Sequence, residues 1–188
     1  MKRIAVYCGS SPGARDIYGQ TAVALGTEMA RRSLGVVYGG GRLGLMGMVA
    51  DAALRAGGEA HGVIPTALVD LEVAHQGLTE LHTVANMHER KALMTELCDA
   101  FIAMPGGVGT LDELFEAWSW NALGYHAKPF GLLNIDGYWD QMIAFLDTVA
   151  DQGFMSQDRR DQLVVSDDIG ELIDLLCART GTTRKMIW

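Results

Sequence analysis

Short, continuously apolar runs alternate with longer segments of helical periodicity along the chain. The runs predicted to be strands are 4–8, 36–38, 61–64, 80–84, 100–104, 130–133 and 163–165. The segments predicted to be helices are 16–33, 45–55, 87–97, 110–123, 138–152 and 169–178. Because such strands are apolar on both faces, they are typical of a mainly parallel sheet covered by helices on both sides. The pattern predicts a single α/β domain over residues 1–188, a Rossmann-like doubly wound fold with a sheet of about seven strands.

The charge balance argues against a nucleic-acid partner. Acidic residues outnumber basic ones by 23 to 15, the formal net charge is −8, and no basic stripe is visible. Proteins that bind nucleic acid usually carry such a stripe, because contacts with phosphates dominate their affinity. A single mononucleotide remains possible, because backbone amides and a few cations can hold one phosphate.

The sequence has no feature of an exported or membrane protein. The first apolar run, from Ile4 to Cys8, has five residues, whereas a signal peptide needs about 7–15. No run approaches the roughly 18 apolar residues of a membrane span. Cys8, Cys98 and Cys177 form no CxxC pair and are expected to be core residues in a reduced compartment. We therefore expect a cytoplasmic protein without a membrane partner.

The unusual residues of the sequence follow the predicted strands. In a doubly wound sheet, ligands bind outside the carboxyl ends of the strands, where the strand order reverses. The segments that follow the first five predicted strands are 9–11, 39–44, 65–77, 86–91 and 105–110. Their convergence on one edge of the sheet predicts the location of the site, with Ser10 in the first segment as a candidate substrate contact.

The segment 105–113 reads PGGVGTLDE and lies between an apolar strand and an amphipathic helix. Its glycines, Gly106, Gly107 and Gly109, let the backbone approach a ligand closely. Backbone amides and the helix dipole would then hold an anion, with Thr110 in the same turn. No Lys-Ser/Thr pair follows, so the segment is not a P-loop. A tight turn is the alternative, but it needs fewer glycines, and we interpret the segment as a phosphate-binding loop.

Glu113 admits two interpretations. Thr110-x-x-Glu113 has the spacing of a capping box, in which the glutamate accepts a hydrogen bond from the cap amide. The same position would direct a carboxylate into the crevice beside a bound phosphate, with Glu116 one turn further on the same helical face. Two carboxylates beside an anion site indicate chemistry on a developing cation, and we favour catalysis by Glu113 over capping alone.

The segment after the fourth predicted strand supplies two candidate cations. Asn86 and Glu89 have the spacing of a capping pair, so Glu89 is expected to be structural. Arg90 shares a helical face with apolar residues, and an inward-facing arginine must meet an anion, either a phosphate or Glu113. Lys91 is the candidate second cation, with a solvated lysine as the alternative.

Cofactor motifs are weak or missing. The segment 39–44 satisfies GxGxxG, but it follows the second predicted strand, and Glu59 precedes the next strand where a dinucleotide-binding domain needs an acid at its end. NAD binding is therefore disfavoured, and a close approach of Gly40 and Gly41 to ribose or phosphate is favoured. The five histidines have no HxH or HExxH spacing, so no metal site is indicated and no cofactor is expected.

These motifs together resemble those of the Lonely Guy (LOG) family of cytokinin riboside 5'-monophosphate phosphoribohydrolases, once labelled lysine decarboxylases. The resemblance rests on the PGGxGTxxE signature at 105–113 and on the segments 8–11, 38–41, 44–47, 62–65, 87–91, 128–134 and 136–138. It implies hydrolysis of the bond between base and sugar in AMP or an N6-substituted AMP, without a cofactor. The family is typically at least dimeric, so a homodimer is expected.

The resemblance also implies roles for particular residues. Arg90 and Glu113 would be the catalytic pair. The implied phosphate contacts are Gly106, Gly107, Gly109, Thr110, Arg90 and Lys91, and the further candidate substrate contacts are Ser10, Gly40, Gly41, Glu72 and Glu116.

Another class of protein would use the same glycine segments. A non-catalytic nucleotide or cofactor carrier, of the molybdenum-cofactor-carrier type, would keep them without needing both Arg90 and Glu113, so their joint presence favours an enzyme. Pyridoxal-dependent decarboxylation is disfavoured, because nothing marks a lysine for a Schiff base. The sequence does not fix the preferred base, the size of the oligomer or the biological role.

Overall fold

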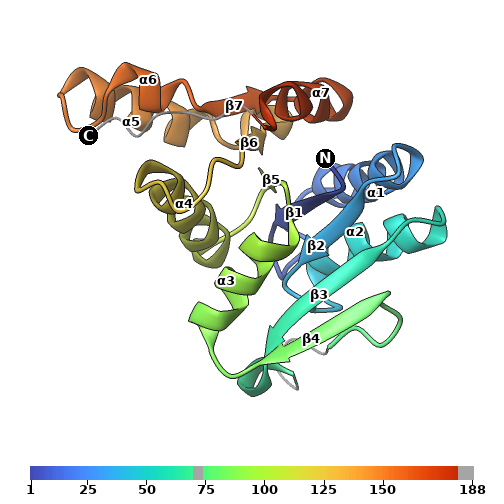
Figure 1. The fold of residues 1–188 in the computed structure, drawn as a ribbon. Coiled ribbons are helices and arrows are strands. Elements are labelled where there is room, and N and C mark those ends of the chain that lie inside the picture. Colours follow the sequence, from blue (N-terminus) through green and yellow to red (C-terminus); the bar gives the residue numbers. More distant parts are fainter. Residues whose placement is uncertain (70–73, 182–188) are drawn as a thin grey trace.

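A sheet of seven parallel strands forms the centre of the computed structural model, which describes residues 1–69 and 74–181 (Figure 1). The strands are β1 (Arg3–Tyr7), β2 (Gly35–Tyr38), β3 (Ala60–Pro65), β4 (Glu80–Val84), β5 (Ala100–Ala103), β6 (Phe130–Leu133) and β7 (Leu163–Ser166). The helices are α1 (Asp16–Arg31), α2 (Gly44–Arg55), α3 (Met87–Leu97), α4 (Val108–Ala122), α5 (Asp140–Asp151), α6 (Gln157–Arg160) and α7 (Ile169–Arg179), with short 3-10 helices η1 (Thr66–Leu68) and η2 (Ile135–Gly137). The predicted α/β fold is confirmed.

The predicted boundaries differ from the observed ones by at most two residues. The difference that matters most for the candidate site is at α4, which begins at Val108, two residues earlier than predicted. The short helix α6 was not predicted, because its sequence QDRR is polar throughout and carries no apolar periodicity. In the part of the chain that the structure describes, no helix is both long and apolar enough to cross a membrane.

Helices cover both faces of the sheet, which explains why its inner strands are continuously apolar, whereas the edge strand β4 carries partly exposed polar residues. Alternate residues of β1 enter different cores. Ile4 and Val6 belong to the core beneath α1, α2 and α7, whereas Ala5 and Tyr7 belong to the core beneath α3, α4 and α5. The ring of Tyr7 stacks on that of Phe101 in β5, with 5.8 Å between centroids. From Ile4 to Tyr7, burial on both faces leaves no position in the strand where a polar side chain would reach water.

Two of the three cysteines are core residues. Cys8 and Cys98 are buried, but Cys177 on α7 is exposed, so the prediction is wrong for that residue. Burial raises the pKa of the Cys8 thiol well above its usual range, and the charge of Glu113 adds to the shift. Burial likewise raises the pKa of Cys98 to about 12. Both buried thiols are therefore protonated and unreactive near neutral pH.

The chain reverses its direction of winding at β1. It moves outward from β1 through β2 and β3 to the edge strand β4, and then returns to the other side of β1 with β5, β6 and β7 (Figure 1). Strands β1 and β5 lie side by side, with Tyr7 paired to Ala103 at their ends. The switch point of the sheet therefore lies between the carboxyl ends of these two strands.

Helices α1 and α2 touch through their backbones at Gly26. A Cβ at this position would overlap the carbonyl oxygen of Val49 and come within 3.0 Å of the Cβ of Ala52. Only glycine allows this approach. Gly19, on the same helix, differs because its nearest neighbour is the flexible side chain of Met48, with the sulfur 3.2 Å from an added Cβ.

Gly26→Ala is expected to lower the free energy of unfolding by about 1–2 kcal/mol, because overpacking outweighs the gain in helix propensity. Gly19→Ala keeps the propensity gain without the backbone collision and should be neutral or stabilising. Urea unfolding followed by circular dichroism measures both. Equal stability of the two variants would contradict the proposed backbone contact.

Candidate functional site

The segments that follow β1 and β5 meet at the switch point. The backbone N–H of Gly9 donates to the carbonyl oxygen of Pro105 at 3.1 Å. The carbonyl oxygen of Gly9 accepts from the N–H of Leu45, at the start of α2, at 3.0 Å. Gly44 packs against the backbone of Ser10, where a Cβ would overlap the Ser10 carbonyl group. Three of the predicted segments therefore converge at one edge, with the exposed Ser10 among them.

One of these segments, the candidate phosphate loop after β5, leads directly into α4. Gly107 is the N-cap and has no side chain to accept the N–H groups of the first turn. Gly107 and Gly109 are exposed, whereas Thr110 is buried beneath the loop. A Cβ on Gly106 would overlap the Thr110 hydroxyl and come within 2.9 Å of the backbone nitrogen of Gly9. The loop thus presents an open helix N-terminus, an arrangement that suits an anion.

Glu113 is not a capping residue. Because Gly107 is the N-cap, Glu113 lies in the second turn of α4, beyond reach of the cap amide. The capping alternative is therefore wrong. The side chain is half-buried, and after burial itself its charge is the largest cause of the raised pKa values of Tyr7 and Cys8. Glu113 therefore lies close to the carboxyl end of β1, beside the switch point.

Helix α3 carries Arg90 into the interior. The predicted capping pair is confirmed: the Asn86 side chain accepts from the N–H of Glu89 at 3.0 Å, and Glu89 accepts from the N–H of Ala85 at 2.9 Å. Arg90 is buried, and its Nη2 donates to the carbonyl oxygen of Gly39 at 3.0 Å. A Cβ on Gly39 would overlap this guanidinium. The glycine after β2 therefore makes room for an arginine from α3.

Lys91 joins α3 to α4 through two ion pairs. Its Nζ lies 3.0 Å from Asp112 Oδ2 and 3.0 Å from Glu116 Oε1. Burial lowers the pKa of Lys91, but the hydrogen bonds to these two carboxylates raise it by more, so the pKa lies above its usual value. Lys91 and Glu116, two separately predicted substrate contacts, are thus direct partners, and the ammonium stays charged.

Gly40 and Gly41 are buried in the loop after β2. Gly40 has a φ of +78°, and its carbonyl oxygen accepts from the N–H of His75 at 3.0 Å. Gly41 forms an antiparallel bridge with Ala74. These glycines therefore tie the loop after β2 to the segment after β3. Glu72, the remaining predicted contact, lies outside the described residues.

Two supporting interactions were not anticipated from the sequence. The Tyr138 hydroxyl donates to the carbonyl oxygen of Gly106 at 2.7 Å, and its ring packs edge-on against Tyr18 at 5.6 Å. His75 Nε2 lies 2.9 Å from Asp51 Oδ1 and so fixes the segment that pairs with the second glycine loop. Tyr138 follows β6, so extending the carboxyl-edge rule to that strand would have identified it. No sequence motif indicates the pairing of His75 with Asp51, because the two residues are 24 positions apart in the chain.

Gly106→Ala is expected to lower the free energy of unfolding by about 1–3 kcal/mol, because the new methyl group must displace Thr110 and the backbone at Gly9. Gly109→Ala is the matched control: an added Cβ there meets nothing within 4 Å, and in the first turn of α4 alanine should be neutral or stabilising. Guanidinium unfolding of both variants provides the measurement. A Gly109→Ala variant as unstable as Gly106→Ala would disprove the packing account.

Solved structures with the same fold include carrier proteins. The molybdenum cofactor binding protein from Rippkaea orientalis has a TM-score of 0.71 at 21% identity, covering 94% of this chain and 95% of that chain. The Moco carrier protein from Chlamydomonas reinhardtii has a TM-score of 0.69 at 19% identity, covering 94% and 96%. At this level of identity the likeness concerns the fold alone.

Sequence relatives are much more similar. A family model described as possible lysine decarboxylase matches residues 46–176. The cytokinin riboside 5'-monophosphate phosphoribohydrolase LOG5 from Arabidopsis thaliana is 46% identical over 191 residues, covering 100% of this chain and 84% of the relative. The protein of the same enzyme name from Rhodococcoides fascians is 49% identical over 169 residues, covering 89% and 85%. This chain therefore belongs to the Lonely Guy family of cytokinin riboside 5'-monophosphate phosphoribohydrolases.

Proposed function

We propose that this protein hydrolyses the N-glycosidic bond of a nucleoside 5'-monophosphate, either AMP or an N6-substituted AMP of the cytokinin type, to give the free base and ribose 5-phosphate. The observation that carries the proposal is the convergence at the switch point. There an open helix N-terminus, a buried arginine and a half-buried glutamate lie along the same edge of the sheet. The names of the relatives that cover nearly the whole chain support the same reaction.

The phosphate would bind at the start of α4. The first-turn N–H groups of a helix have no partners within the helix and carry its positive dipole end. Gly107 and Gly109 are exposed there, so a phosphate can approach the backbone without meeting side chains. Arg90 would supply positive charge from the side of α3. Binding energy from the phosphate then positions the distant glycosidic bond for reaction.

The reaction itself needs a stabilised sugar cation and an activated water. As the C1′–N bond breaks, positive charge develops on the sugar, and a carboxylate close to that carbon stabilises it. Glu113 has the charge and location for this role, and it can accept a proton from the attacking water. The water oxygen bonds to C1′, the bond electrons leave with the base, and the base nitrogen regains a proton. Arg90 would hold the phosphate and orient Glu113.

Lysine-dependent decarboxylation fits the structure poorly. A lysine that forms a Schiff base must be available as a neutral amine, which requires a lowered pKa. Lys91 is the buried lysine among the described residues, and its two carboxylate partners raise its pKa. The description of the family model as a possible lysine decarboxylase is therefore not the activity that we propose.

We also propose that the protein is a homodimer and that it acts in the cytoplasm. We propose no nucleic-acid or membrane partner for it. Helix α4 and the turn after it expose four large apolar side chains: Val108, Phe115, Leu123 and Tyr125. Large apolar side chains exposed on one element are the basis on which we propose an interface there. The net charge of −8 supports a small nucleotide rather than a polynucleotide as the ligand.

Glu113→Gln is expected to lower kcat by about 10²–10⁴-fold, because it removes the proton acceptor and the negative charge beside the sugar. Arg90→Ala should raise KM as well as lower kcat, because it removes phosphate binding. Chromatography of free base released from AMP and from isopentenyladenosine monophosphate gives both constants. The ratio of the two wild-type rates sets the preferred base.

Glu96→Gln, which alters an exposed carboxylate on α3, is the control and should retain wild-type rates. Circular dichroism and AMP titration establish that each variant folds and binds nucleotide. If folded wild-type protein binds AMP but releases base from neither nucleotide, the hydrolase proposal fails and a nucleotide carrier becomes the better explanation.

A further inference from the structure

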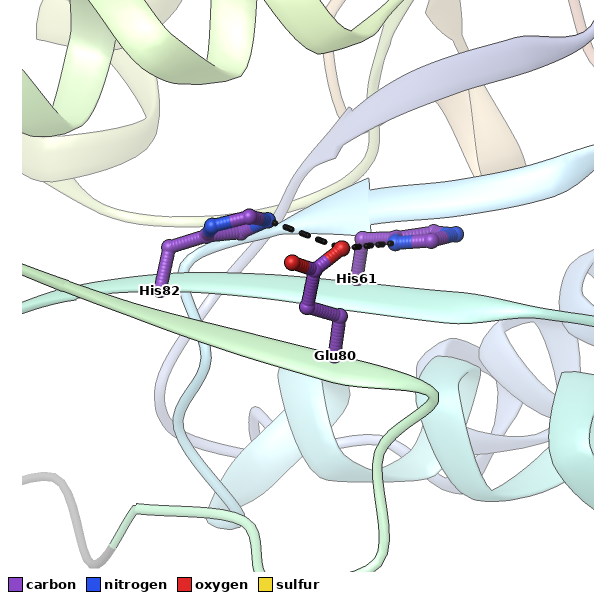
Figure 2. A group of neighbouring side chains, drawn as sticks. All are labelled: His61, Glu80 and His82. Carbon is purple, nitrogen blue, oxygen red and sulfur yellow. Dashed lines mark ion pairs between the residues drawn. The ribbon is translucent and has the colours of Figure 1, made fainter.

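Three side chains meet on β3 and β4, away from the glycine loops. His61 is paired across the strands with Glu80, and Val63 is paired with His82. Because residues two apart on a strand share a face, His61, Glu80 and His82 lie on one side of the sheet, and Figure 2 shows them directed toward one another. One ligand atom from each of the three lies within 4.8 Å of the other two.

The distances in this cluster suit a small tetrahedral metal ion. Glu80 Oε2 lies 3.7 Å from His61 Nδ1 and 3.4 Å from His82 Nε2 (Figure 2). Two ligands bound tetrahedrally at about 2.0–2.1 Å from zinc are separated by about 3.3–3.4 Å. A shift of a few tenths of an ångström would bring Glu80 Oε2 to this separation from each histidine nitrogen, and the two histidine nitrogens already lie within 4.8 Å of each other.

The buried histidine supplies the second observation. His61 is only 3% exposed, because β3 lies between β2 and β4. Its Nε2 lies 3.2 Å from Glu59 Oε2. A carboxylate oxygen accepts a hydrogen bond, so this contact favours the tautomer with the proton on Nε2. In the tautomer with the proton on Nε2, Nδ1 carries the lone pair, and this nitrogen lies 3.7 Å from Glu80 Oε2. Within residues 1–69 and 74–181, neither His61 Nδ1 nor His82 Nε2 has a hydrogen-bond partner.

We propose that His61, Glu80 and His82 bind a divalent transition-metal ion, with Zn²⁺ the best match. Two imidazoles and one carboxylate favour Zn²⁺ and its neighbours in the first transition row over Mg²⁺ or Ca²⁺, which prefer oxygen ligands. Glu59 completes a carboxylate–histidine–metal arrangement that fixes the His61 tautomer. The Glu80 side chain is 57% exposed, so water can occupy the fourth position.

The site is separate from the proposed hydrolase site. His61 and Glu80 stand at the amino ends of β3 and β4, whereas the glycine loops follow the carboxyl ends of the strands. The metal would clamp the edge strand β4 to β3 and so stabilise that edge of the sheet. The inference does not depend on the proposed function, and nucleotide hydrolysis needs no metal from this cluster.

The test is a Zn²⁺ titration of full-length protein stripped with a chelator, measured by competition with a chromophoric chelator. We expect one equivalent to bind with micromolar or tighter affinity. His82→Ala and Glu80→Gln, which alter partly exposed residues, should each weaken binding by at least about 100-fold, and Glu59→Gln by about 10–100-fold. His88→Ala, an exposed histidine outside the cluster, should leave the affinity unchanged.

Co²⁺ provides a readout of geometry. A tetrahedral site gives intense visible absorption in the wild type and in His88→Ala, and this absorption should be absent from His82→Ala. Zn²⁺ should raise the Tm of wild type but not of His82→Ala. Equal Zn²⁺ affinity of wild type and His82→Ala, or loss of binding in His88→Ala instead, would overturn the proposal. Release of base from AMP, measured on His82→Ala, tests the hydrolase proposal separately from the metal site.

Discussion

The hydrogen bond between the N–H of Gly9 and the carbonyl oxygen of Pro105 joins the two halves of the molecule at the point on which the site depends. It holds the ends of β1 and β5 together, and the chain has no space for a Cβ at Gly106 beside it. Gly106 is thus required first by the protein's own packing, whereas Gly107 and Gly109 are exposed with open space around them. Their openness to a ligand follows, because segments packed this tightly leave the first turn of α4 facing outward.

Much of this arrangement is predictable because a parallel sheet converts sequence order into position. Continuous apolar runs identified the strands, and the residues after them reached one edge. Prediction is less accurate where a helix begins at a glycine and not at the side-chain capping motif beside it. The Thr110-x-x-Glu113 spacing suggested a cap, but Gly107 starts α4 earlier and leaves Glu113 one turn too far along. The inward direction of Arg90 followed from helical periodicity, whereas its partner Gly39 came from another strand and was not foreseeable.

The histidine cluster shows a different limit of sequence reasoning. Metal motifs on helices are recognised by short spacings, and none occurs here. In a sheet, ligands become neighbours through strand register, so His61 and Glu80 meet although they are far apart in the chain. Glu80 and His82 alternate on one strand, a spacing that any half-buried strand can show. Only the pairing of β3 with β4 makes these residues a group.

Tyr138 has a consequence for how proteins of this fold diverge. Its hydroxyl supports the main chain at Gly106, while 40% of the residue is exposed and no ligand contact is required of it. A change at this position would alter how rigidly the loop is held without changing the proposed substrate contacts. The rigidity of the glycine loop can therefore be tuned at a surface aromatic side chain that lies outside the proposed catalytic groups.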